Sequence, residues 1–334
     1  MNWLGLDIGG ANIKAALSDG SVSSIPFRFW VEHERLKESL SEIITELSSS
    51  EPVRIAATMT AELADCFETR QVGVEFIVDC LDSVCSQLGL SEPVYAGTDL
   101  AFRTGDDAKD HWLKTAASNW TMMAAFASRF LPQQSGLVID MGSTTTDIIP
   151  VTEGNVAAIG KTDSQRLQHG ELVYVGAKRT PVCSIVQSLE SDGAAIPIAR
   201  EFFATVDDAM LLCEFAAEND ADCDTADGRP RTIACAAQRL CRMICEDTVT
   251  MRQEDVTSLA SQVLKQVERL LLSKIDEPSD IICTGSGVEF LMHVIKKRFP
   301  SANATTLGSF AGAKIDAAAP AFATAVLASE RPEL

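Results

Sequence analysis

The chain has 334 residues, of which 46% are hydrophobic, and it carries a formal net charge of −19 at pH 7. This length is enough for two lobes or domains, and the apolar content excludes a disordered chain. The acidity excludes nucleic acid and anionic membranes as partners, because long-range repulsion would oppose their approach.

The N-terminal segment MNWLGLDIGG lacks the basic start and the cleavage site of a signal peptide. No apolar run reaches roughly the 18 residues that a membrane-spanning helix needs. The ten cysteines are scattered and form no C-x-x-C pair, so we expect reduced thiols rather than a zinc site. These features predict a soluble, cytoplasmic protein.

The first part of the chain alternates between strands and helices. Short turns, Gly-Gly and Asp-Gly-Ser, are typical of antiparallel hairpins and separate the first three strands. The predicted elements are strands at 3–8, 11–17 and 25–30, a helix at 33–47, a strand at 53–57, a helix at 72–88, a strand at 93–96 and a long helix at 109–130. The segment PQQSG that follows is typical of a linker, so we place the first lobe at residues 1–134.

The second part of the chain begins as the first does. Residues 136–151, GLVIDMGSTTTDIIPV, repeat the order of apolar strand, aspartate, small-residue turn and second strand. Asp7 and Asp140 each start the pattern D-x-G-[GS]-x-[NT], 133 positions apart (140 minus 7), which indicates an internal repeat. A strand at 155–159, helices at 232–245 and 255–272, a strand–turn–helix unit at 280–299 and a helix at 317–328 are expected to follow.

This order of elements predicts an α/β fold with two duplicated lobes around a cleft. The second lobe is placed at residues 135–316. The segment 317–334 is expected to form a C-terminal helix that returns to the first lobe.

The two hairpin turns have the chemistry of phosphate-binding loops. Small residues let backbone N–H groups approach a ligand without obstruction by Cβ, and such groups bind phosphate oxygens. Asn12 and Lys14 share one face of their strand, so Lys14 can reach the same anion. Two such turns across a cleft would hold a diphosphate from both sides. The candidate phosphate-binding residues are Gly9, Gly10, Asn12, Gly142, Ser143, Thr144, Thr145 and Asp147.

Asp7 and Asp140 each end an apolar strand, where a carboxylate is costly unless a positive charge meets it. Mg²⁺ prefers carboxylates together with substrate oxygens, so both are candidate metal ligands and catalytic residues, with Lys14 as a further catalytic residue. A structural turn is the competing explanation for either hairpin alone. The repetition of the pattern favours the phosphate and Mg²⁺ site.

A third glycine-rich turn, CTGSGVEF, lies between a predicted strand and a predicted helix. Its candidate phosphate-binding residues are Gly285, Ser286 and Gly287, because the backbone can approach a phosphate or a nucleotide at such a turn. The competing explanation is a helix start that packs on a sheet, which is common in α/β proteins.

These turns resemble those of the actin-like ATPase fold, which is ribonuclease H-like and is shared by sugar kinases, acetate kinases, 70-kDa heat-shock proteins and actin. More specifically, the chain resembles the hydantoinase/oxoprolinase-like family, in particular its short branch linked to tetrahydromethanopterin-dependent one-carbon metabolism. The stretches that carry this resemblance span both lobes: GLDIGGANIK, ATMTAELADCFETRQVGVEFI, AASNW, VIDMGSTTTDIIPV, HGELVYVGAKRTPV, FATVDDAMLL and DTADGRPRT.

The resemblance implies a Mg²⁺-dependent transferase of methanofuran-type cofactor biosynthesis. Archaeal members of this branch join (5-aminomethyl-3-furyl)methyl diphosphate to the phenol of γ-glutamyltyramine and release pyrophosphate. The implied partners are therefore a small-molecule diphosphate and a phenolic acceptor. ATP is the alternative occupant of the cleft, as in the wider fold, although the compact chain favours a substrate diphosphate in its place.

The family-like stretches also supply candidate residues. Glu62 is a candidate catalytic base for the phenol proton, because a free phenol has a pKa of about 10. Arg70 and Arg179 are candidates for bidentate contacts with phosphate or with the glutamyl carboxylates. The remaining candidate substrate-binding residues are Asn119, His169, Glu171 and Asp227. The competing explanations are a helix cap for Glu62, a structural histidine, and surface salt bridges for the arginines.

Two other functions remain open at this point. One is an ATP-dependent kinase or a hydantoinase/oxoprolinase-type amidohydrolase of the same fold, which ATP binding with substrate-stimulated ADP release would favour. The other is a non-catalytic nucleotide-sensing module. The sequence leaves the acceptor, the general base and the oligomeric state open, and a homo-oligomer is compatible with it.

Overall fold

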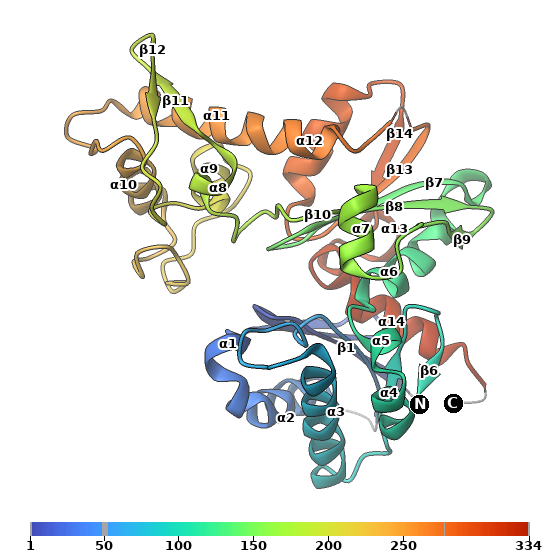
Figure 1. Ribbon diagram of the computed structural model, residues 1–334. Helices are drawn as coiled ribbons and strands as arrows, with labels where there is room; N and C mark the ends of the chain where they lie inside the picture. The colour runs from blue at the N-terminus through green and yellow to red at the C-terminus, as the bar shows by residue number, and fades with distance from the viewer. Residues whose placement is uncertain (1, 49–52, 277, 333–334) are drawn as a thin grey trace.

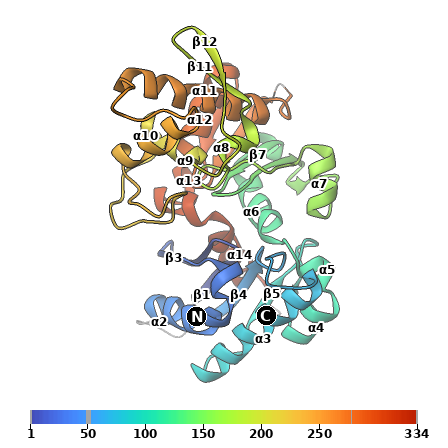
Figure 2. The same cartoon turned by 60° about the vertical axis from the view of Figure 1, so that its left-hand side comes forward.

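The computed structural model describes residues 2–48, 53–276 and 278–332. Two lobes, each built on a six-stranded sheet, lie one above the other, and the C-terminal helix runs between them (Figures 1 and 2). None of the helices in the described ranges has the length and apolar character needed to span a membrane.

The sheet of the first lobe has the strand order β3-β2-β1-β4-β5-β6. The central strand β1 pairs antiparallel with β2 and parallel with β4. Both central strands are almost continuously apolar, because helices cover both faces of the sheet. The strands are β1 (Asn2–Ile8), β2 (Asn12–Leu17), β3 (Val22–Pro26), β4 (Val53–Met59), β5 (Val94–Ala96) and β6 (Phe102–Arg103).

The sheet of the second lobe repeats this arrangement. Its main path is β10-β8-β7-β13-β14, and β9 pairs with β8. The central strand β7 pairs antiparallel with β8 and parallel with β13, as β1 does with β2 and β4. The strands are β7 (Gly136–Met141), β8 (Thr146–Thr152), β9 (Asn155–Val156), β10 (Leu172–Val173), β13 (Asp280–Thr284) and β14 (Asn303–Thr306).

Helices and one extra hairpin complete the lobes. The helices of the first lobe are α1 (Phe29–Glu32), α2 (Leu36–Leu47), α3 (Arg70–Gln87), α4 (Gly105–Asp110), α5 (Trp112–Thr115) and α6 (Asn119–Ala127). Those of the second are α7 (Asp163–His169), α8 (Val182–Ile185), α9 (Val206–Leu212), α10 (Ile233–Arg242), α11 (Gln253–Leu272), α12 (Val288–Arg298) and α13 (Gly308–Ala311). The hairpin of β11 (Ser188–Ser191) and β12 (Ala194–Pro197) packs beside α11 (Figure 1).

The C-terminal helix α14 (Ala319–Ser329) packs against β1 of the first lobe and against α6. A buried apolar cluster joins the lobes there, with Met123 of α6, Val138 of β7 and Ala321 of α14 among its members. The lobe boundaries at residues 134 and 316 stay predictions. Residues 333–334 of the expected C-terminal segment lie outside the described ranges.

Gly5 of β1 lets α14 lie directly on the first sheet. A Cβ at this position would overlap the backbone oxygen of Ala321 and would lie 2.8 Å from the backbone nitrogen of Ala325. We therefore expect Gly5→Ala to lower the free energy of unfolding by ~1–3 kcal/mol, measured by urea denaturation. Gly10→Ala is the matched control, since a Cβ there meets no atom within 4 Å. Equal stability of the two variants would contradict this close packing.

The long helix expected at 109–130 is wrong. The chain forms α4, α5 and α6 instead, and Ala117 between the last two adopts a left-handed φ of 48°. In this conformation the backbone N–H of Ala117 lies near enough to Glu62, and the side chain of Asn119 near enough to Asp7, to lower the pKa of each carboxyl group. These contacts outweigh the helix propensity of an alanine-rich stretch. The third strand of the first lobe lies at Val22–Pro26, earlier than the expected 25–30, and that of the second lobe is shorter than expected, at Asn155–Val156.

Candidate active site

Equivalent turns connect the first two strands of each lobe. In the first turn the backbone N–H of Gly9 donates a hydrogen bond to the carbonyl of Asn12 (3.0 Å). In the second, the N–H of Gly142 donates to the carbonyl of Thr145 (2.9 Å). The two turns therefore close in the same way. Their central residues are only partly buried, so backbone groups remain accessible to a ligand.

Asp7 and Asp140 lie at the ends of β1 and β7 and are only 6% and 7% exposed. Burial raises the pKa of both carboxyl groups, to about 7 for Asp140, and the charges of Asp147 and Asp7 add to the shift of Asp140. The nearby ammonium of Lys14 acts in the opposite direction on both. Both carboxyl groups therefore lie within electrostatic range of Lys14, and Asp140 also lies within range of Asp7.

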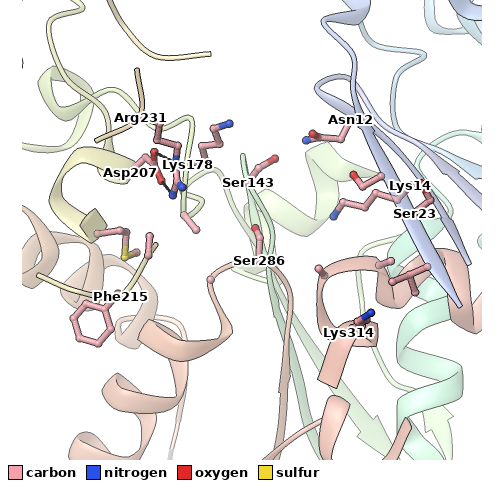
Figure 3. Close-up of a pocket in the computed structure, with 18 residues that line it drawn as sticks. Asn12, Lys14, Ser23, Ser143, Lys178, Asp207, Phe215, Arg231, Ser286 and Lys314 are labelled. Carbon is pink, nitrogen blue, oxygen red and sulfur yellow. Dashed lines mark hydrogen bonds and ion pairs between the residues drawn. The ribbon is translucent and has the colours of Figure 1, made fainter. Parts of the chain in front are cut away.

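A cleft of about 320 Å³ is lined by residues of both lobes, among them Lys14 and Ser143, while Asp7 and Asp140 do not line it (Figure 3). Lys14 and Lys314 extend into it from one wall, and Lys178 and Arg231 from the other. Arg231 is held by two hydrogen bonds to Asp207, both of 2.6 Å, and Lys178 pairs with Asp222. Ser143 and Ser286, from two of the glycine-rich turns, lie between the walls. The arrangement suits an anionic ligand that spans the lobes.

The third glycine-rich turn packs against the second aspartate. The backbone N–H of Gly287 donates to the carbonyl of Met141 (2.9 Å). Gly285 adopts a φ of 97°, and a Cβ there would overlap Oδ1 of Asp140. Glycine at position 285 therefore allows the turn to approach the carboxylate, and the turn brings Ser286 into the cleft.

Glu62 is buried, with 2% exposure, and its Oε2 atom has no hydrogen-bond partner among the described residues. Burial raises its pKa to about 8, and the charge of Asp163 adds to the shift. Arg70 and the backbone N–H of Ala117 act in the opposite direction. Glu62 belongs to the first lobe and Asp163 to the second. A carboxylate with one free oxygen and a pKa near neutrality is suited to accept a proton.

Asn119, Asp147 and Arg70 lie close to these carboxylates. The side chain of Asn119 lies close enough to Asp7 to lower the pKa of that carboxyl group. Asp147 forms an ion pair of 2.7 Å with the buried guanidinium of Arg166, which is stacked over the ring of Trp120 at 4.0 Å. The ion pair and the stacking position α7 of the second lobe against α6. One oxygen of Asp147 is therefore engaged within the protein, and its role at a phosphate stays a prediction.

Three other candidate residues have structural surroundings. Both oxygens of Glu171 accept backbone N–H bonds, from Ile159 (2.6 Å) and Gly160 (2.8 Å). Partial burial raises the pKa of Asp227, but hydrogen bonds from Arg229 and Arg239 outweigh this effect and hold the pKa at about 2. His169 is exposed at the end of α7. The substrate-binding roles of these residues stay untested predictions, and their positions favour local structural roles.

Sequence reasoning missed several residues that line the cleft, among them Ser23, Lys178, Arg231 and Lys314. Lys178 and Arg231 lie inside the family-like stretches HGELVYVGAKRTPV and DTADGRPRT, which was the available signal. Lys314 has no such signal, because only the return of the chain toward the first lobe brings it to the cleft. Asp163, whose charge raises the pKa of Glu62, was missed because only the placement of the two lobes brings it near Glu62.

The carboxylate pair is compatible with a divalent cation. No group of three or more His, Cys, Asp or Glu side chains that could hold a metal occurs in the described ranges. Asp7 and Asp140 alone supply two buried anionic oxygen ligands with raised pKa values and a single neighbouring lysine. This set fits Mg²⁺, which is bound through one or two carboxylates and completes its shell with water and phosphate oxygens.

Comparison with known proteins agrees with this architecture. Residues 54–324 match the model of the Hydantoinase/oxoprolinase family. The chain belongs to the hydantoinase/oxoprolinase family. A relative in this family from Methanocaldococcus jannaschii is named (4-{4-[2-(gamma-L-glutamylamino)ethyl]phenoxymethyl}furan-2-yl)methanamine synthase. It is 33% identical, and the match covers 97% of this chain and 96% of the relative.

A second hydantoinase/oxoprolinase relative, from Methanococcus vannielii, carries the same name. It is 31% identical over 199 residues, which are 57% of this chain and 89% of that relative. Among solved structures, nucleotide-free acetone carboxylase resembles this chain with a TM-score of 0.50 and 12% identity, over 90% of this chain and 46% of that one. The duplicated lobes and strand orders confirm the expected two-lobed, actin-like α/β fold.

Proposed function

We propose that this protein is a transferase of methanofuran-type cofactor biosynthesis. It joins (5-aminomethyl-3-furyl)methyl diphosphate to the phenol of γ-glutamyltyramine or a similar acceptor and releases pyrophosphate. The observation that carries the proposal is the 33% identity over 97% of the chain to a synthase whose printed name describes a phenoxymethyl-furan product. The basic cleft between two glycine turns supports it, since the donor substrate is a diphosphate.

The chemistry places one main demand on the protein. When the bond between the furylmethyl carbon and the diphosphate oxygen breaks, the furan ring delocalises the positive charge, and the leaving pyrophosphate carries the negative charge. Lys14 and the N–H groups of the two hairpin turns are the groups that stabilise this charge in the cleft. Preorganised donors of this kind contribute ~3–4 kcal/mol each to the transition state.

Asp7 and Asp140 would hold Mg²⁺ in this proposal, next to the candidate phosphate-binding turns. When bound, Mg²⁺ supplies charge neutralisation at the diphosphate oxygens. Asn119 favours the ionised form of Asp7, because its side chain lowers the pKa of that carboxyl group. Lys14 lies close enough to both aspartates to lower their pKa values. In this proposal its ammonium would therefore lie beside the diphosphate.

Glu62 is the proposed base for the phenol proton. Of the four carboxylate and histidine candidates, it alone combines burial, a free oxygen and a pKa of about 8. Glu171 has both oxygens occupied by backbone N–H groups, and Asp227 is held by arginines. As the phenol oxygen attacks the furylmethyl carbon, its proton passes to Oε2 of Glu62. The arginines proposed to contact the anionic groups of the substrates are Arg70 and Arg179.

The direct test is a reconstituted reaction. We expect the purified protein with Mg²⁺ and both substrates to release pyrophosphate and form one aryl ether per pyrophosphate, measured by a coupled pyrophosphate assay and mass spectrometry. Omission of the phenol should leave the ether absent. No pyrophosphate with both substrates present would refute the proposal. A parallel experiment with ATP tests the alternative function. Release of ADP that the substrates stimulate would favour an ATP-dependent kinase or amidohydrolase.

A further inference from the structure

A cation–π contact joins the two lobes. The guanidinium of Arg179, which follows β10 in the second lobe, lies over the ring of Trp30 in α1 of the first lobe, 4.1 Å from the ring centre. The sequence stretch HGELVYVGAKRTPV contains Arg179, but nothing in the sequence indicates Trp30 as its partner. The contact therefore depends on how the two lobes are placed.

Each member of this pair is tied to one of the two hairpin turns. Beside Trp30, the backbone N–H of Phe29 donates to the carbonyl of Gly10 (3.0 Å). On the other side, the backbone N–H of Arg179 donates to the carbonyl of Ser143 (2.8 Å). Gly10 and Ser143 occupy equivalent positions in the repeated pattern. The contact thus bridges the two turns that would hold the diphosphate.

The guanidinium of Arg179 has no hydrogen bond or ion pair with any residue in the described ranges. The charge of Asp224 raises the pKa of Arg179, and the carboxylate of Asp224 lies 3.8 Å from the ammonium of Lys178. Half-burial lowers the pKa of Arg179, as expected where no carboxylate compensates for lost hydration. A planar guanidinium that is stacked on an aromatic ring and has free donors is suited to bidentate contact with a phosphate.

This position matters for the chemistry of the proposed reaction. After the carbon–oxygen bond breaks, the electron pair leaves with pyrophosphate, and the furylmethyl cation accepts whichever oxygen reaches it. Attack by the phenol oxygen gives the aryl ether, and the phenol proton goes to Glu62. Attack by water gives the furylmethanol, and the water proton is lost instead. Exclusion of water therefore decides whether the protein is a transferase or a diphosphate hydrolase.

We propose that Arg179, stacked on Trp30 where the two hairpin turns meet, contacts the terminal phosphate of the diphosphate and closes the site against water. This inference rests on the proposed function and adds a positioning pair to it. The pair determines whether the phenol or water attacks the furylmethyl cation. Removal of either side chain should therefore change the products of the reaction and not only its rate.

The test compares pyrophosphate released with ether formed. For the unmodified protein the ratio should be about one. For Trp30→Ala it should rise about fivefold, with the furylmethanol accounting for the excess, because the stacking contact is lost. Trp30→Phe keeps an aromatic face and should restore a ratio near one. Arg179→Gln should raise the ratio and also weaken the binding of inorganic pyrophosphate about tenfold, measured by calorimetry.

A matched control lies on the far side of the first lobe. Arg54 is stacked over Trp3 at 4.5 Å, at the end of the sheet opposite the hairpin turn, so Arg54→Gln should leave the ratio unchanged. A ratio of one in both Trp30→Ala and Arg179→Gln, or unchanged pyrophosphate binding in Arg179→Gln, would overturn the inference alone. Absence of pyrophosphate from the unmodified protein would overturn the proposed function, and this inference with it.

Discussion

Glu62→Gln is expected to lower kcat by ~10²–10⁴-fold, the usual contribution of a positioned general base. The amide has the size of the carboxylate but cannot accept the phenol proton. The free Oε2 atom and the burial of Glu62 are the features on which this expectation depends. Single-turnover measurement of ether formation isolates the chemical step from product release.

The same carboxyl group should set the pH dependence. Burial raises its pKa to about 8, with Asp163 adding to the shift and Arg70 opposing it. A base must be deprotonated, so kcat/KM should rise with pH and level off above about 8. Glu62→Gln should lack this rise. An unchanged pH profile in the variant would show that another group takes the proton.

Protein stability provides a second measurement on this residue. The folded pKa of Glu62 is raised from 4.5 to about 8, so the folded state binds the proton more tightly than the unfolded state does. The contribution of Glu62 is therefore fully present below about pH 4.5 and is lost as the pH rises to about 8. Glu62→Gln should remove this loss. The exposed Glu68 supplies the control, since Glu68→Gln should change neither activity nor the pH profile.

Asp140→Asn is expected to reduce pyrophosphate release at least ~100-fold, because one of the two proposed Mg²⁺ ligands and its charge are lost. We expect the same substitution to increase the stability of the protein while it lowers the activity. Burial raises the pKa of Asp140 from 3.8 to about 7, so the ionised carboxylate destabilises the ligand-free protein as the pH rises through this range. The variant should therefore melt at a higher temperature than the unmodified protein at pH 8 without Mg²⁺.

The rise in Tm on ligand binding distinguishes the loss of a Mg²⁺ ligand from a general disruption of the fold. Mg²⁺ with pyrophosphate should raise the Tm of the unmodified protein, because both would bind only the folded state, and this increase should disappear in Asp140→Asn. Asp276→Asn is the control, since Asp276 is an exposed aspartate of the same lobe. A full Mg²⁺-dependent increase in Asp140→Asn would exclude this carboxylate as a ligand.

Local patterns alone determined the framework of the site. The alternation of apolar residues, the aspartates at strand ends and the small residues in the turns predicted both hairpins, β1–β2 and β7–β8. They did so because strand pairing and turn geometry depend on residues a few positions apart. The repeat of D-x-G-[GS]-x-[NT] predicted the two-lobed fold, since similar local sequences form similar local structures.

The tertiary structure decided which of the candidates have free, buried or paired side chains. It breaks the expected helix at Ala117, places Asp163 beside Glu62, and turns Glu171 and Asp227 toward local backbone and arginine partners. It also brings Arg179 over Trp30, 149 positions away (179 minus 30). Burial and the charge of distant neighbours control the pKa and the accessibility of a side chain, and residues far apart in the chain create both only when the lobes meet.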